Sequence, residues 1–214
     1  MRVLVGCESS GVVREAFRRR GHHAVSCDLL PADDGSAAHY QEDIFQVLHV
    51  ARWDLLIVHP PCTYLSVSGL HWNHRRPERA AQTESALHFV QRLLELPRVY
   101  PRLRLCLENP RGCISTRIRR PNQSIQPHQF GHDASKLTDL WLDGLEPLRI
   151  DPAKFVPGRI VGTDKRGRPI MRWANQTDSG QNRLGPSPDR WKLRSRTYEG
   201  IAEAMAEQWG GAHG

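Results

Sequence analysis

The sequence has no long uninterrupted apolar run, no close cysteine pair and no internal repeat. A membrane helix needs roughly 20 apolar residues, so we expect a soluble protein without a membrane partner. Structural zinc sites usually show tight cysteine pairs, so Cys106, Cys113, His128 and His132 predict no metal site. Five scattered cysteines argue against a disulfide framework. The opening "MRVLVGCESS" is interrupted too soon for a signal peptide, which favours the cytoplasm.

Charge is the next constraint on function. The 214-residue chain has a formal net charge of +7, with +1 on residues 1–110 and +6 on residues 111–214. A basic half is typical of a protein that binds a polyanion such as nucleic acid. A solvated surface explains the same charge about equally well. No feature indicates an obligate protein partner.

Short apolar segments alternate with helical ones along the first half of the chain. We expect strands at "RVLV", "HAVSCD", "WDLLIVHPP" and "LRLCLENP", and helices over residues 12–20, 43–50 and 77–96. This alternation predicts a mostly parallel sheet in an α/β sandwich. Ligands of such sheets bind beyond the carboxyl ends of the strands. The loops there, "GCESSG", "DLLPAD", "HPPCTYLS" and "ENPRG", collect the polar and unusual residues and therefore predict the site.

The second half of the chain lacks this regular alternation of strands and helices. "KLTDLWLDGL" predicts a strand pair or a strand and turn, and "GTDKRGRPIMRW" predicts a short hairpin inside a loop-rich stretch over residues 145–190. A closing helix is expected in "TYEGIAEAMAEQWG", because Ile201, Met205 and Trp209 are spaced by four residues.

Three positions fit an adenosine-bearing cofactor. The loop after the first strand holds Gly6 and Gly11, which alone suit a nucleotide loop and an ordinary turn equally well. Asp28 ends the second strand, where an acid can accept hydrogen bonds from ribose hydroxyls. Asp43 offers an acceptor for an adenine amino group.

Cys62 follows two prolines at the end of an apolar strand. Proline fixes φ and lacks an N–H, so the pair would hold Cys62 above the sheet edge. A free cysteine is usually a small buried hydrophobe, but this polar position favours a nucleophile. Glu108, which ends the next strand, either pairs with an arginine or donates a proton. "RIRR", residues 117–120, is either a solvated loop or a phosphate clamp.

These motifs, in this order, resemble those of the C5-cytosine DNA methyltransferases. "HPPCTYLS" is similar to their Pro-Pro-Cys-Gln-x-Phe-Ser motif, and "LENP" to their Glu-Asn-Val motif. "GCESSGVVREAFRRRGHHAVSCD" stands where their first cofactor loop and ribose acid lie, and "EDI" matches their adenine-contacting motif in position. "FGHDASKLTDLWL" resembles their Tyr-Gly-Val-Pro-Gln-x-Arg-x-Arg strand in layout. The resemblance covers roughly residues 2–144 and 189–209, and the whole chain most resembles compact methyltransferase-like proteins of bacteriophages.

The resemblance implies a fold and a reaction. The fold is a Rossmann-like methyltransferase sandwich, with a catalytic domain over residues 1–144 and 189–214 and a reduced target-recognition insert over 145–188. The reaction is methylation of cytosine C5 in DNA, single- or double-stranded, by S-adenosyl-L-methionine. Cys62 would attack C6 of a flipped-out cytosine while Glu108 assists at N3.

The resemblance also implies which side chains form the site. The catalytic residues are Cys62, Glu108 and Lys136. The cofactor-binding residues are Gly6, Glu8, Ser9, Gly11, Asp28, Leu29, Asp43, Ile44 and Pro60. The substrate-binding residues are Pro61, Ser66, Asn109, Arg117, Arg119, Arg120 and Thr138.

The sequence leaves alternatives open. Lys136 and Thr138 stand where the family has two arginines, and the insert is short, which also suits a catalytically weak or inactive nucleic-acid-binding protein. The same chemistry could act on RNA or a free cytosine nucleotide, or transfer a group larger than methyl. Exocyclic-amine methyltransferases also use Pro-Pro, but His59 before it and Cys62 after it tell against that class.

Overall fold

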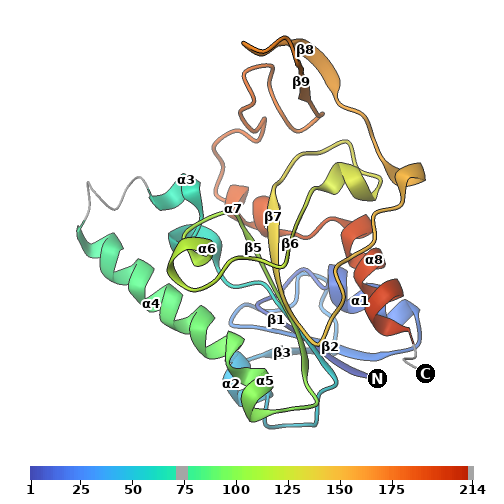
Figure 1. The fold of residues 1–214 in the computed structure, drawn as a ribbon. Helices are drawn as coiled ribbons and strands as arrows, with labels where there is room; N and C mark the ends of the chain where they lie inside the picture. Colours follow the sequence, from blue (N-terminus) through green and yellow to red (C-terminus); the bar gives the residue numbers. More distant parts are fainter. Residues whose placement is uncertain (71–76, 212–214) are drawn as a thin grey trace.

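A computed structural model of the chain describes residues 1–70 and 77–211. A seven-stranded sheet runs through the molecule in the order β3-β2-β1-β4-β5-β7-β6 (Figure 1). The strands are β1 (Arg2–Gly6), β2 (His23–Asp28), β3 (His39–Gln41), β4 (Leu55–Val58), β5 (Arg104–Pro110), β6 (Gln123–Ile125) and β7 (Thr138–Asp143). The helices are α1 (Val12–Arg19), α2 (Ile44–Val47), α3 (Val67–Leu70), α4 (Pro77–Leu94), α5 (Leu96–Val99), α6 (Ile114–Arg117), α7 (Arg190–Ser195) and α8 (Glu199–Gly210), with short 3-10 helices η1 (Cys62–Tyr64), η2 (Pro127–Phe130) and η3 (Pro152–Lys154).

The sheet is parallel over its first five strands, because β3, β2, β1, β4 and β5 pair in parallel. β7 runs antiparallel to both of its neighbours, β5 and β6. The predicted α/β fold class is therefore confirmed: the chain folds as a Rossmann-like α/β sandwich with a mostly parallel sheet.

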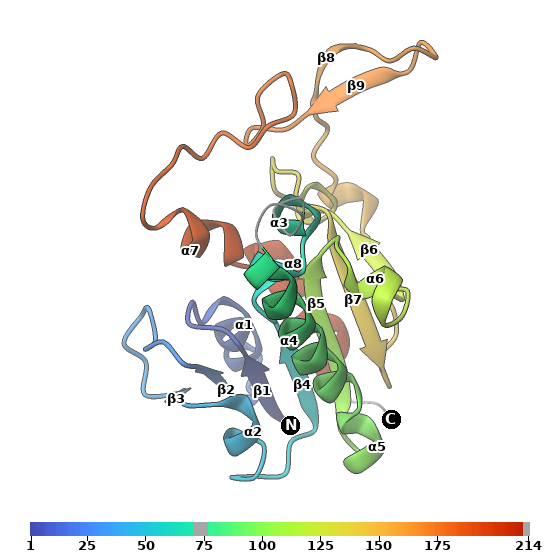
Figure 2. The same ribbon diagram turned by 90° about the vertical axis from the view of Figure 1, so that its left-hand side faces the viewer.

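Helices cover both faces of the sheet, as Figure 2 shows. On one face, α1 and α8 pack against alternate residues of the central strands, with Phe17, Met205 and Trp209 fully or almost fully buried. On the other face, α2, α4 and α5 cover the remaining strand residues, with Trp141 at the centre. Strands buried on both faces explain the nearly continuous apolar runs in the sequence.

A second, two-stranded sheet stands beyond the carboxyl ends of the parallel strands (Figures 1 and 2). It is the hairpin of β8 (Arg159–Thr163) and β9 (Pro169–Arg172), which confirms the hairpin predicted in this stretch. Trp173, directly after β9, stacks on His128 with ring centroids 4.1 Å apart, and this contact joins the hairpin to the main body. The hairpin lies within the predicted insert over residues 145–188, whose role as a separate unit stays a prediction.

Most predicted elements form where the hydrophobic pattern placed them. The helices over 12–20 and 77–96 end one or two residues early, at Arg19 and Leu94. "KLTDLWLDGL" forms one strand, β7, followed by a turn at Gly144, rather than a strand pair. The closing helix buries the predicted Ile201, Met205 and Trp209. Within residues 1–70 and 77–211, no helix is long and apolar enough to cross a membrane.

Candidate functional site

The sheet topology brings the predicted catalytic residues to one edge. β4 and β5 are parallel neighbours, so the loop after Val58 and the end of β5 meet there. β7 is antiparallel, and its first residue, Thr138, pairs with Pro110 at the end of β5. Lys136, two residues before Thr138, therefore reaches the same edge from the other direction.

The backbone around Cys62 is fixed on both sides. The Cys62 carbonyl oxygen accepts hydrogen bonds from the Leu65 and Ser66 N–H groups at 3.1 and 2.9 Å. Before it, the Asn109 side-chain amide donates to the Pro60 carbonyl oxygen at 2.7 Å, which ties the two prolines to the end of β5. The Cys62 residue itself is only half-buried. The thiol is held at the rim of the sheet and is not part of the hydrophobic core.

Glu108 is buried and held by several partners. His59 Nδ1 lies 2.9 Å from Glu108 Oε2. The Thr138 hydroxyl, which donates to the Lys136 carbonyl oxygen at 3.1 Å, lies near the same carboxylate. Burial raises the pKa of Glu108, but the His59 hydrogen bond, the Lys136 charge and the neighbouring Thr138 hydroxyl outweigh it and leave the pKa below its usual value. Glu108 is thus ionised at neutral pH in the free protein, and its partners are a histidine, a threonine and a lysine rather than the arginine considered from sequence.

The Cys62 thiol is electrostatically coupled to the same group of side chains. Burial raises its pKa above the usual value for cysteine, and the Glu108 charge raises it further. Lys136, and Arg194 from α7, act in the opposite direction. Cys62 is therefore protonated at neutral pH, and Lys136 is placed to stabilise the thiolate whenever it forms.

The raised pKa of Cys62 predicts slow alkylation. Iodoacetamide should label Cys62 more slowly than free cysteine at pH 8, and the rate should keep rising with pH above the usual thiol range. Lys136→Met removes a charge that lowers this pKa, and each unit of further rise slows labelling roughly tenfold. Peptide mass spectrometry measures labelling at Cys62 alone, with the exposed-lysine variant Lys154→Met as control. Faster labelling than free cysteine, or no effect of Lys136→Met, would contradict this assignment.

The loop after β1 combines tight turns with a buried acid. The Glu8 carboxylate accepts hydrogen bonds from the Val13 N–H at 2.8 Å and the Arg14 N–H at 3.2 Å, so it caps α1. Gly11 adopts φ 70°, which favours glycine. Cys7, between Gly6 and Glu8, has φ 56° and is the one non-glycine residue with positive φ in the described part of the chain. Such local strain is typical of binding loops, and no sequence pattern predicts it.

The two predicted adenosine contacts lie at neighbouring strand ends. One Asp28 oxygen accepts the Leu30 N–H at 3.0 Å, and one Asp43 oxygen caps α2 through the Phe45 N–H at 2.7 Å. Leu29 is 71% exposed, so its apolar side chain is accessible for packing against a flat ring such as adenine. The buried Ile44 packs against Gly6 so closely that a Cβ at Gly6 would collide with it. These acids and this apolar surface fit an adenosine group, although one oxygen of each carboxylate already accepts a hydrogen bond from a backbone N–H.

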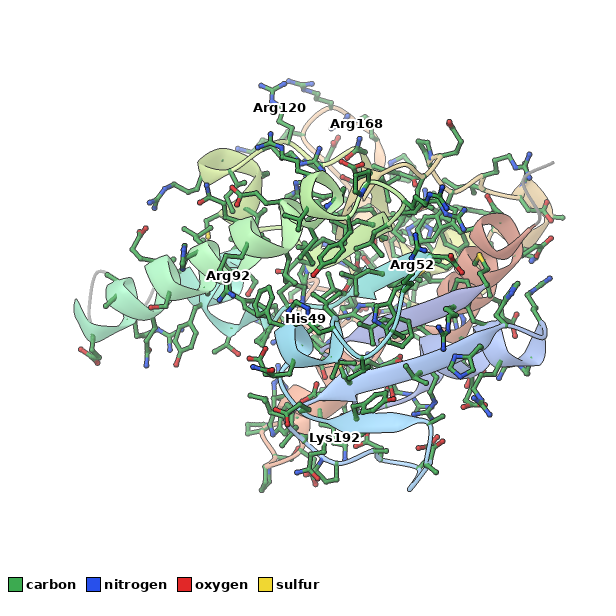
Figure 3. All side chains as sticks on the ribbon, turned by 90° about the horizontal axis from the view of Figure 1, so that it is seen from below. His49, Arg52, Arg92, Arg120, Arg168 and Lys192 are labelled. Atoms are coloured by element: carbon green, nitrogen blue, oxygen red, sulfur yellow. The ribbon has the colours of Figure 1, made fainter. Side chains whose placement is uncertain are left out.

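The predicted substrate-binding residues are spread more widely. Ser66 is buried and forms a β-bridge with Gly112, and Pro61 is exposed beside Cys62. Arg117 makes a surface ion pair with Glu84 of α4, with nitrogen–oxygen distances of 2.9 and 3.0 Å. Arg119 is exposed and makes a long contact to the Leu142 carbonyl oxygen at 3.4 Å. Arg120 projects into solvent, on the side of the molecule opposite Lys192 (Figure 3). The "RIRR" segment is exposed at the surface, and its phosphate-clamp role stays a prediction.

Two features of the site come from α7, which sequence reasoning missed. Lys192 of α7 forms an ion pair with Asp33, in the loop after β2, at 2.8 Å. The charge of Arg194, two residues further along α7, lowers the pKa of the Cys62 thiol. α7 thus carries one basic residue paired with the loop after β2 and another whose charge acts on Cys62. A basic segment before the closing helix was visible in the sequence, but nothing there indicated its position.

Fold and site together define a class: a Rossmann-like α/β protein with a cysteine and a glutamate at the carboxyl edge of its sheet. No known family profile and no curated protein matches the sequence. A solved E. coli structure, described as a candidate DNA modification methyltransferase encoded within a prophage, aligns with 66% of this chain at 14% identity and a TM-score of 0.42. The chain spans 46% of that protein. At this identity and score we base no functional conclusion on the likeness.

Proposed function

We propose that the protein is an S-adenosyl-L-methionine-dependent DNA cytosine-C5 methyltransferase. One observation carries the proposal: at the carboxyl edge of the sheet, a half-buried thiol, an ionised carboxylate and an ammonium group lie close enough for their charges to shift one another's pKa values. A structural cysteine would pack in the core, as Cys106 does. The thiol of Cys62 instead has a charged environment that can stabilise a developing thiolate.

These groups suit the activation of cytosine, whose C5 is a poor nucleophile. The Cys62 thiol would give its proton to solvent, and its sulfur would form a bond to C6 while the C5=C6 electron pair shifts through the ring toward N3. N3 would take a proton through the Glu108 side chain, which is ionised in the free protein and must first be protonated. The resulting ring is nucleophilic at C5. Once C5 carries the methyl group, loss of the C5 proton to solvent and expulsion of Cys62 as a thiolate would restore the aromatic ring. Lys136 would favour the first step by stabilising the thiolate.

The cofactor would lie over the ends of β1, β2 and β3, with Asp28 at its ribose and Asp43 at its adenine. When bound there it supplies the methyl group. Gly6 lies beside Val58 and His59, because β1 and β4 are adjacent in the sheet, so the loop at Cys7 and the segment that leads to Cys62 leave the sheet at the same edge. The transferred group would therefore meet the target ring at the edge where Cys62 and Glu108 lie.

A duplex base cannot reach such an edge, so the target cytosine would be flipped out of the stack. The basic second half of the chain supports a polyanionic substrate. Its hairpin, β8–β9, lies beyond the same edge and exposes Lys165 and Arg166 at its turn. A short hairpin of this size favours recognition of a short site.

Identification of the product tests the proposal. The protein is incubated with labelled S-adenosyl-L-methionine and duplex DNA, single-stranded DNA, RNA or a free cytosine nucleotide, and digested nucleosides are separated by mass spectrometry. We expect 5-methyl-2′-deoxycytidine from a DNA substrate. N4-methylcytosine or N6-methyladenine would replace the proposal by the exocyclic-amine class. Nucleic-acid binding without transfer to any substrate would replace it by a binding protein.

A further inference from the structure

His59 lies between two carboxylates at the edge of the sheet. Its Nδ1 is 2.9 Å from Glu108 Oε2, and its side chain is 10% exposed against 9% for Glu108. On its other side, the His59 ring is close enough to Glu8 for its charge to lower the pKa of that carboxyl, against the larger rise caused by burial. The order of β1, β4 and β5 in the sheet explains this arrangement, because Glu8 and His59 follow β1 and β4 and Glu108 lies near the end of β5.

The second ring nitrogen, His59 Nε2, indicates whether this histidine serves only for packing. It is buried and has no hydrogen-bond partner in the described part of the chain. A buried polar atom without a partner costs about 1–3 kcal/mol, so a histidine that served only to pack here would be a poor choice. A charged ring carries the same cost at Nε2, but its attraction to the Glu108 carboxylate offsets that cost.

Several charged groups surround His59. Arg14 approaches Glu8, whose pKa burial raises, and is engaged by Glu15 at 2.8 Å and by Asp34. Among the described residues, the Lys136 charge acts on Glu108 and the Arg194 charge acts on the Cys62 thiol. Glu108 is the carboxylate in direct contact with His59, and a proton on the His59 ring makes this contact an ion pair.

We propose that His59 is the proton reservoir for Glu108, which loads the carboxylate with the proton that it delivers to the target base. This inference rests on the proposed function and adds a residue to it. Glu108 is ionised in the free protein and cannot protonate N3 as it stands. When the thiolate adds to C6, the His59 Nδ1–H bond breaks, the proton moves to Glu108 Oε2, and Glu108 passes a proton to N3. His59 is left neutral, and it regains the proton when N3 loses it during ring restoration.

His59 acts on the base only through Glu108, so it is a positioning residue rather than a catalytic one. The variant His59→Asn separates the two parts of its role. The asparagine amide can replace the Nδ1–H donor to Glu108, but it cannot hold a titratable proton. His59→Ala removes both. His49→Asn is the matched control, because His49 is an exposed histidine between α2 and the first residue of β4, whereas His59 follows the last residue of β4 (Figure 3).

The first test is the pH profile of methyl transfer. In His59→Asn we expect kcat at pH 7.5 to fall at least about tenfold with KM nearly unchanged, since proton transfer contributes 10²–10⁴-fold. Activity should recover in part toward pH 5.5, where Glu108 takes its proton from solvent. The descending limb of the plot of kcat against pH therefore moves to lower pH. His49→Asn should match the wild type. An unchanged profile in His59→Asn, or a loss that is equal at every pH, would overturn the inference.

The second test does not need activity. Nitrogen-15 NMR of histidine-labelled protein reports the protonation of each ring, and the signal missing from His59→Asn identifies His59. We expect both ring nitrogens to be protonated at pH 7, and the ring to become neutral in Glu108→Gln. A neutral His59 in the wild type would overturn the inference even if the product is 5-methylcytosine. A charged His59 in a protein that makes no 5-methylcytosine would instead count against the proposed function alone.

Discussion

Replacing Cys62 with serine is expected to abolish methyl transfer. The serine hydroxyl is far less acidic than a thiol and a weaker nucleophile, and loss of a covalent nucleophile typically costs more than about 10³-fold in kcat. The fold should be unaffected, because Cys62 is half-buried at the rim and its backbone hydrogen bonds to the Leu65 and Ser66 N–H groups do not involve the side chain. The measurement is the rate of incorporation of labelled methyl into cytosine-containing DNA.

The control for this result is Cys113→Ser. Cys113 is a buried cysteine of the neighbouring loop, bound through its backbone N–H to the Leu65 carbonyl oxygen at 2.9 Å. It should retain most of the activity, and both variants should bind S-adenosyl-L-methionine with wild-type affinity by calorimetry. Normal methylation by Cys62→Ser would show that Cys62 is not the nucleophile.

Glu108→Gln is expected to have the second-largest effect. Glutamine has the same shape and keeps an acceptor for His59 and Thr138, but it cannot pass a proton to N3. The expected loss in kcat is about 10²–10⁴-fold, measured in the same assay. Lowering the pH should not restore the rate, because no carboxyl remains at this position to be protonated.

A second readout separates this loss from misfolding. The Glu108 charge raises the pKa of the Cys62 thiol, so its removal lowers that pKa and increases the thiolate fraction at neutral pH. Iodoacetamide should therefore label Cys62 faster in Glu108→Gln than in the wild type, while methyl transfer falls. Slower labelling, or wild-type transfer, would contradict the role given to Glu108.

The position of the main site was predictable because the rules for parallel sheets are strict. The apolar runs before Cys62 and up to Glu108 indicated two strands, and parallel strands present their carboxyl ends at one edge. The fold class followed from the same pattern. Lys136 was found only through the resemblance to a family, and the strand β7 places it beside Glu108.

The remaining features depended on contacts that no local pattern encodes. β3 and β6 have three residues each, too few for a periodicity to be recognised. The contact between His59 and Glu108 joins residues 49 positions apart. The ion pair between Asp33 and Lys192 depends on where α7 lies in space, and a basic segment gives no such information. Asp43 was predicted from its position alone, and its helix-capping role became visible only with the structure.

Trapping of the reaction on DNA that contains 5-fluorocytosine tests the central claim most directly. Fluorine at C5 cannot leave as a proton does, so the protein should remain covalently attached to DNA after incubation with S-adenosyl-L-methionine. We expect a complex that resists denaturation and has the mass of protein, DNA and one methyl group, with the modified base on the peptide that contains Cys62. A link to any other residue, or no covalent complex on a sequence that the protein methylates, would contradict the account.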